Sequence, residues 1–323
     1  MYFPFIRGKT YDLLALRELL NNISNASDFY LPIIEPVKDD LSNLKKLFDD
    51  YNKKGQKFIL IANPLVGELK ESNISAIKKE LIDNAFDFDK IIFAYQIKSS
   101  TKLTELNNFQ NLFFNKSKNN KFVFIHTESN SNFNDIKNII NSDNILYNIL
   151  DEEYTDRMYR NDIKNLTVES VVIKDNFKVL KNANYSADDF FSDLYAVHKN
   201  EGYNGGFGDY LTIGKEYRDT GGAAYAVAIH LTYFSDRDVL RVRHFKSKTN
   251  DSPVNVAGKF SEALDDMFAY IKLNDMSFQT KACEEFRQLH KAGTYKGLGY
   301  IKKLSIKHHI ELIVNKMKSE KSK

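Results

Sequence analysis

Two cations stand in a short turn near the start of the chain. Arg7, Gly8 and Lys9 directly follow the first apolar run and precede an amphipathic segment. The first N–H groups of a helix have no partner within it, so a turn at this place favours an anion. Arg7 and Lys9 are therefore predicted to hold a phosphate or carboxylate group. Ion pairing of these cations with Glu35 or Asp12 is the alternative.

Two further ionisable residues end apolar runs. Glu35 closes the stretch Pro-Ile-Ile-Glu. As a general base it would need a pKa raised by burial, whereas as a structural partner of Arg7 it would stay ionised. His126 follows Phe122–Ile125, so we expect it to point into the mouth of the fold and act as an acid or base. A histidine bonded to a neighbouring backbone group is the alternative.

The densest group of unusual residues is the segment Gly-Gly-Phe-Gly-Asp-Tyr, residues 205–210. Three glycines within four residues allow close backbone approach or positive φ. Asp209 is therefore the third acid or base candidate, and Tyr210 is a candidate ligand-binding residue. Asn63 and Gln96 end two other apolar runs and are predicted to bind the ligand as well.

Sequence motifs for metals and nucleotides are missing. The chain has no H-E-x-x-H, no Walker loop, no G-x-S-x-G elbow and no G-x-G-x-x-G after its first apolar runs. His308 and His309 are adjacent, and adjacent side chains on a helix point about 100° apart, so both rarely bind one metal. No metal site is predicted, and the cofactor stays unknown.

Eight apolar runs must position these residues. Most are apolar at consecutive positions, which is typical of strands buried on both faces of a parallel sheet. Amphipathic segments with helical spacing separate the first runs. Strand–helix alternation needs parallel strands and right-handed crossovers, and eight units predict an α/β fold of the (β/α)8 TIM-barrel type. The runs begin at Tyr2, Tyr30, Phe58, Ile91, Phe122, Ile145, Val168 and Phe207.

The alternation of apolar runs and amphipathic segments ends after the eighth run. We expect residues 1–213 to form the barrel core, and residues 214–323 to form a hairpin and helices that pack on the barrel or complete it. Ala223–Phe234 and Val239–Phe245 predict two antiparallel strands. Val256–Ile271 has the spacing of a helix.

Composition excludes several classes of protein. The chain has 323 residues, of which 42% are hydrophobic and 28% charged, so it is not disordered. The single cysteine, Cys283, excludes an intrachain disulfide, and no apolar run is long enough to cross a membrane. We therefore expect a cytoplasmic protein. The net charge of +3 is too small to indicate nucleic acid, and the lysine-rich end after Lys296 favours a solvated tail over a nucleic-acid contact.

Several of these segments resemble the phage Beta-protein family and its uncharacterised bacterial relatives. The resemblance rests on residues 2–9 with the leucine-rich stretch after them, residues 32–35, residues 207–210 and the late His308-His309. It implies a barrel-like fold and a setting in phages or mobile elements. The chain departs from the family at Arg7, where a lysine is expected, and in having no tryptophan.

Two kinds of function follow. The first is an enzyme whose mouth binds a phosphorylated or nucleotide-like anion, held by Arg7 and Lys9, with Glu35, His126 and Asp209 as acid and base candidates. The alternative is a non-enzymatic binding subunit of a phage-conflict (defence) system, acting through a protein partner encoded nearby. Direct nucleic-acid binding through the basic end is a third, weaker hypothesis.

Overall fold

The structure is a computed structural model that describes residues 1–70, 72, 74–114, 121–219, 222, 224–272 and 278–322. The chain divides into two compact units. The barrel unit comprises residues 1–13, 25–175 and 197–210, and the second unit comprises residues 14–24, 176–196 and 211–323. The chain thus enters the second unit twice before it stays there from Leu211 onward.

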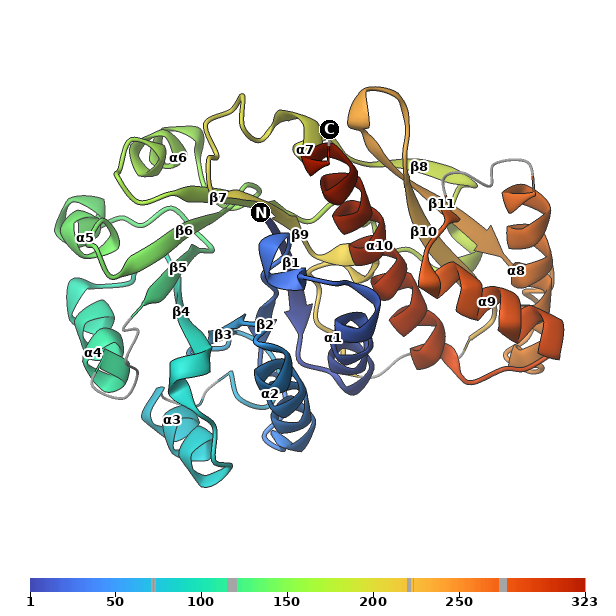
Figure 1. Cartoon of the computed structure of the whole chain (residues 1–323), viewed down its shortest axis with the longest axis horizontal. Helices are drawn as coiled ribbons and strands as arrows, with labels where there is room; N and C mark the ends of the chain where they lie inside the picture. The colour runs from blue at the N-terminus through green and yellow to red at the C-terminus, as the bar shows by residue number, and fades with distance from the viewer. Residues whose placement is uncertain are drawn as a thin grey trace. The chain divides into compact units, whose positions relative to one another are not determined.

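Eight parallel strands close into a barrel, which confirms the predicted (β/α)8 fold (Figure 1). Each of the eight apolar runs supplies one strand. The eighth strand carries the label β9, because β8 belongs to another sheet. The strands, in their order around the barrel, are β1 (Tyr2–Arg7), β2 (Ile33–Glu35), β3 (Phe58–Ile61), β4 (Ile91–Ile97), β5 (Phe122–His126), β6 (Ile145–Asp151), β7 (Ser170–Lys174) and β9 (Gly206–Asp209).

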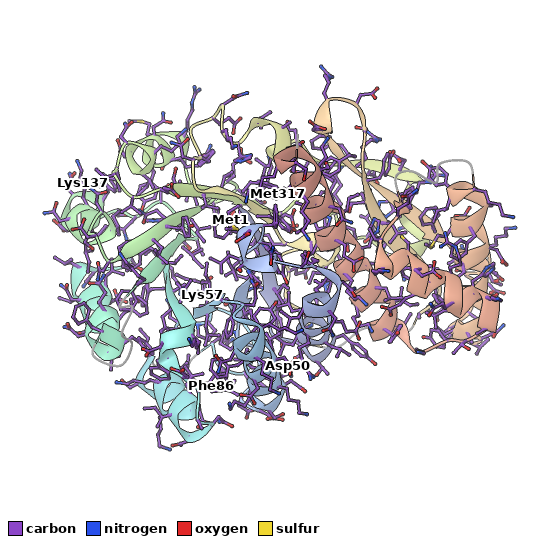
Figure 2. The ribbon with its side chains drawn as sticks, in the orientation of Figure 1. Met1, Asp50, Lys57, Phe86, Lys137 and Met317 are labelled. Atoms are coloured by element: carbon purple, nitrogen blue, oxygen red, sulfur yellow. The ribbon has the colours of Figure 1, made fainter. Side chains whose placement is uncertain are left out.

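Helices cover the outside of the strands in the barrel unit (Figure 1). Their apolar stripes are buried; in α5, for example, Ile136 and Ile140 are fully buried, while Lys137 is exposed at the outer edge (Figure 2). These helices are α2 (Ser42–Lys54), α3 (Ile74–Asp83), α4 (Leu103–Phe114), α5 (Phe133–Ile140) and α6 (Arg157–Lys164). Helix α1 (Thr10–Asn22) begins in the barrel unit, and the residues from Leu14 onward belong to the second unit.

The glycine-rich segment before Asp209 forms β9, the strand that closes the barrel. Strand β9 pairs with β1 on one side and with β7 on the other. A Cβ atom on Gly206, whose φ is +137°, would lie 2.0 Å from the carbonyl oxygen of Met1, and a Cβ on Gly208 would lie 2.1 Å from that of Phe3. No side chain fits at such distances, so the glycine-rich segment serves close backbone approach.

The second unit contains a three-stranded antiparallel sheet and helices. Strands β10 (Ala228–Phe234) and β11 (Leu240–Lys246) form the predicted hairpin, and its expected first residue, Ala223, lies outside the described residues. Strand β8 (Asp188–Ser192), which was not predicted, pairs with β11. The helices are α7 (Leu194–Val197, its last residue in the barrel unit), α8 (Val256–Ile271), α9 (Lys281–Ala292) and α10 (Leu298–Lys321). None of the helices, over the residues described, is both long and apolar enough to cross a membrane.

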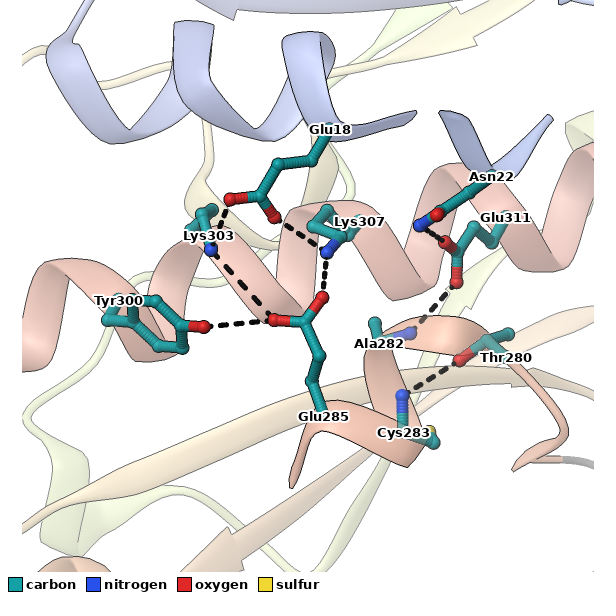
Figure 3. A network of polar contacts seen from close by, with 10 residues as sticks. All are labelled: Glu18, Asn22, Thr280, Ala282, Cys283, Glu285, Tyr300, Lys303, Lys307 and Glu311. Carbon is teal, nitrogen blue, oxygen red and sulfur yellow. Dashed lines mark hydrogen bonds and ion pairs between the residues drawn. The ribbon is translucent and has the colours of Figure 1, made fainter. Parts of the chain in front are cut away.

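The lysine-rich end differs in part from the expected solvated tail. It forms helix α10, and the side chains of Lys303 and Lys307 are 1% and 2% exposed. Glu18 binds both lysines, at 2.6 and 2.7 Å, and Glu285 of α9 contacts both from the other side (Figure 3). The Tyr300 hydroxyl also donates a hydrogen bond to Glu285. These two lysines are therefore interior residues; the last lysine, Lys323, lies outside the described residues.

Candidate ligand site at the barrel mouth

A ring of polar residues closes the carboxyl end of the barrel interior. Successive side chains of a strand point to opposite faces, and the inward-facing residues below this ring are apolar apart from Gly206 and Gly208. The change from apolar to polar occurs at the same level on every strand. The polar ring, as we name it, consists of Arg7, Glu35, Asn63, Gln96, Thr127, Asp151, Asp175 and Tyr210.

Four ring residues from neighbouring strands form one hydrogen-bonded network. Arg7 makes an ion pair with Glu35, whose side chain is fully buried. The other carboxylate oxygen of Glu35 accepts hydrogen bonds from the Leu65 backbone N–H at 2.6 Å and from the Gln96 amide at 3.1 Å. Asn63 and the Gln96 backbone exchange two hydrogen bonds, of 2.7 and 3.0 Å. Three donors on Glu35 favour the charged carboxylate, so this residue positions Arg7 and is poorly suited to be a base.

The turn after β1 differs from the expected anion cradle. The Gly8 N–H donates to the Glu35 carbonyl at 2.8 Å, and the Lys9 N–H donates to the Arg7 carbonyl at 2.6 Å. Both backbone N–H groups therefore already donate hydrogen bonds within the barrel unit. Any anion at this place would be held by the side chains of Arg7 and Lys9. Lys9 is half-buried, whereas Arg7 lies over the rings of Phe5 and Tyr210.

Tyr210 links the cationic side of the ring to an acidic side. Its hydroxyl donates a hydrogen bond of 2.9 Å to Asp151, and both side chains are buried. Burial, together with the charge of Asp151, raises the pKa of Tyr210 well above its ordinary value, so the phenol keeps its proton. Asp151 has no role in the sequence-based prediction, although Asp151 ends an apolar run as Glu35 does. Arg7, Tyr210, Asp175 and Asp151 follow one another around the barrel on β1, β9, β7 and β6.

The prediction that His126 points into the mouth is wrong. Its side chain lies on the outer surface of β5, where Nδ1 bonds the Tyr159 hydroxyl of α6 at 2.7 Å and Nε2 bonds Asn148 at 3.0 Å. The Asn148 amide donates to the Ile140 carbonyl, so its oxygen accepts from the histidine. Burial lowers the pKa of His126 to about 4. This histidine is a neutral, fully bonded link between strands and helices, and its partners are side chains, not the backbone group of the structural alternative.

Asp209 also faces away from the mouth. It alternates with Tyr210 on β9, and it accepts a hydrogen bond of 2.9 Å from the Tyr2 hydroxyl, whose ring packs on Phe207. Burial, with the charge of Asp209, raises the pKa of Tyr2 well above its ordinary value. Of the predicted site residues, the polar ring therefore brings together Arg7, Glu35, Asn63, Gln96 and Tyr210, with Lys9 in the turn that follows Arg7, and leaves out His126 and Asp209.

Loops at the same end of the barrel are tied to one another. Glu128 accepts hydrogen bonds from the backbone N–H and the hydroxyl of Ser99, at 2.9 and 2.6 Å. The Asn130 amide donates to the carbonyls of Lys98 and Thr101. These contacts join the loops after β4 and β5 and give the ring a fixed surround on that side.

Two small cavities lie away from the polar ring. One, of about 10 Å³, lies in the barrel unit against α2 and α3, and the other, of about 20 Å³, lies in the second unit between α8 and α9. Within the described ranges, no three His, Cys, Asp or Glu side chains are grouped so that they could hold a metal ion.

The fold and the polar ring together define a (β/α)8 barrel with a polar carboxyl end. No protein-family model and no curated protein matches the chain. The relationship to the phage Beta-protein family therefore stays a prediction.

Proposed function

We propose that the carboxyl-end mouth of the barrel binds a small phosphorylated or carboxylated molecule that also carries hydroxyl groups, and acts on it as an enzyme. The observation that carries this proposal is the polar ring. Every barrel strand changes from apolar to polar at the same level, and (β/α)8 enzymes have their active sites at this end of the barrel. One fold carries many unrelated functions, so the chemistry of the ring residues must support this function as well.

The ring has two chemically different sides. Arg7, oriented by Glu35, and the neighbouring Lys9 supply positive charge for an anionic group. Asp151 and Asp175 supply carboxylates on the other side, where Asp151 can accept a proton from a hydroxyl group of the ligand. Tyr210 contacts Asp151 and lies beside Arg7, so it is placed to orient the ligand between the two sides.

Binding measurements test this proposal. We expect ribose 5-phosphate to bind in isothermal titration calorimetry, ribose to bind far more weakly, and inorganic phosphate to compete. Lys9→Ala should weaken ribose 5-phosphate binding about tenfold, as expected for one lost charged contact. Lys57→Ala is the matched control, because this exposed lysine precedes β3 at the opposite end of the barrel.

Two outcomes would overturn the proposal. One is equal binding by the Lys9→Ala and Lys57→Ala variants, which would show that the charge at the mouth is irrelevant. The other is an absence of saturable binding by the phosphorylated sugar and by phosphate, in which case the non-enzymatic alternative gains support.

A further inference from the structure

Three ionisable side chains lie on one face of the sheet in the second unit, one from each strand. His230 of β10 is directly opposite His244 of β11. Asp189 of β8 is opposite Val242, two residues before His244, and therefore points to the same face. Because β8 is distant in the sequence from the hairpin of β10 and β11, no motif indicates this grouping.

The contacts between these side chains indicate the position of each proton. Nδ1 of His230 lies 2.7 Å from Nδ1 of His244, and Nε2 of His244 lies 3.3 Å from Oδ2 of Asp189. An aspartate carboxylate only accepts, so Nε2 of His244 carries a proton. A neutral imidazole has one N–H, so Nδ1 of His244 must accept a hydrogen bond. His230 then donates through Nδ1, and its Nε2 keeps a lone pair.

Both histidines are held neutral, as this arrangement requires. Burial lowers the pKa of His230 well below its ordinary value, and His244 and Lys302 lower it further. Burial also lowers the pKa of His244, against the opposing charge of Asp189. Lys246, which bonds the Tyr185 carbonyl, is the nearby cation that lowers the pKa of His244.

The surroundings hold the pair rigidly and leave its outer member accessible. The Tyr185 ring stacks on His244 at 4.5 Å, and Phe177 and Tyr185 contact His230 edge-on at 5.1 and 4.7 Å. His244 is buried, whereas His230 is half-buried. Across the described residues, no hydrogen bond reaches Nε2 of His230. The lone pair therefore lies on the less buried histidine, at one end of this chain of contacts.

We propose that Asp189, His244 and His230 form a proton relay, and that Nε2 of His230 is the base of a second chemical site, separate from the polar ring. The site fits a ligand with an O–H or N–H donor next to a flat apolar group, because the lone pair is flanked by the rings of Phe177 and Tyr185. The ligand proton passes to Nε2 of His230, and the resulting imidazolium keeps its Nδ1–H bond to His244. Asp189 and His244 are positioning residues in this scheme.

The tautomers of the wild-type histidines give the first test, and it requires no substitution. Long-range ¹H–¹⁵N correlation spectra at pH 7 should show His230 in the Nδ1–H form and His244 in the Nε2–H form. Most free imidazoles in water prefer the Nε2–H form, so packing alone does not produce the expected result for His230. Finding His230 in the Nε2–H form would overturn the relay.

The second test measures the reactivity of the lone pair. Diethyl pyrocarbonate acylates an imidazole nitrogen through its lone pair, and mass spectrometry reports the rate at each histidine. In Asp189→Asn the new amide can donate to His244, which reverses the relay and places the proton on Nε2 of His230. We expect acylation of His230 to slow about tenfold, as for a histidine that loses its orienting carboxylate.

His290 is the internal control for this reactivity. It lies on α9 and bonds Asp265, away from the relay, so its acylation rate should be the same in both proteins. An unchanged rate at His230 in Asp189→Asn, with an unchanged tautomer, would refute the relay. If acylation of both His230 and His290 becomes faster, the variant is less tightly folded than the wild type. The tautomers of the wild-type histidines then decide whether the relay exists.

Discussion

The guanidinium of Arg7 and the carboxylate of Glu35 form an ion pair inside the barrel, where their side chains are 9% and 0% exposed. A buried charge that loses its partner strongly destabilises the folded protein, because the charge then has neither its ion pair nor the hydration that it has in the unfolded chain. We therefore expect Arg7→Met to lower the free energy of unfolding by about 3–5 kcal/mol. Urea unfolding followed by circular dichroism measures the difference.

The exposed pair of Lys38 and Glu68 is a matched control in the same unit. Its side chains are 41% and 40% exposed and screened by water, so Lys38→Met should cost far less stability than Arg7→Met. Adding Glu35→Leu to Arg7→Met should recover part of the loss, because no unpaired buried carboxylate remains. Equal losses in the Arg7 and Lys38 variants would contradict the buried pair.

A second prediction concerns the pH dependence of folding. Burial lowers the pKa of His126 in the folded protein to about 4, whereas the unfolded chain has the ordinary value of about 6.5. Between these values the unfolded state binds a proton that the folded state does not. Stability is therefore complete above about pH 6.5 and is lost as the pH falls toward 4, by on the order of 3 kcal/mol for this residue.

His126→Gln isolates this contribution. Glutamine cannot take up a proton, so the variant should be less stable at pH 7.5 and should lose less stability between pH 6.5 and 4.5. The comparison requires urea unfolding of both proteins at several pH values. His308 has a pKa lowered to about 4 by burial as well, so a part of the slope will remain. Parallel pH profiles would show that His126 is not held neutral.

The barrel could be predicted because its strands are short apolar runs at regular intervals, and the level of the polar ring follows from where those runs end. What the runs do not reveal is which face each side chain occupies. His126 and Asp209 lie one position before the inward-facing Thr127 and Tyr210. A strand buried on both faces has no alternation of polar and apolar residues, so the sequence does not show that His126 and Asp209 point away from the mouth.

The interior of the second unit was harder to predict, because polar residues build part of it. Lys303, Lys307, His308 and Glu311 of α10 are all buried, so the segment has no apolar stripe typical of a packed helix. Their partners include Glu18 and Thr232, which are distant in the sequence. Local patterns cannot show pairings of that kind, and the pairing of β8 with β11, which brings Asp189 to His244, escaped prediction for the same reason.

Helix α10 offers a direct comparison between a buried lysine and an exposed one. Burial alone would lower the pKa of Lys307, but hydrogen bonds to Glu18 and Glu285 raise it above its ordinary value, so the amine stays charged. Lys307→Met leaves two carboxylates facing each other with only Lys303 between them. Because both carboxylates are partly exposed, we expect the free energy of unfolding to fall by about 3 kcal/mol, which is at the lower end for a broken buried pair.

Lys302→Met on the same helix is the control. It removes an exposed lysine and should change stability by less than about 0.5 kcal/mol. Urea unfolding at pH 7 compares the two variants, and similar stabilities would mean that this end of the chain is solvated after all.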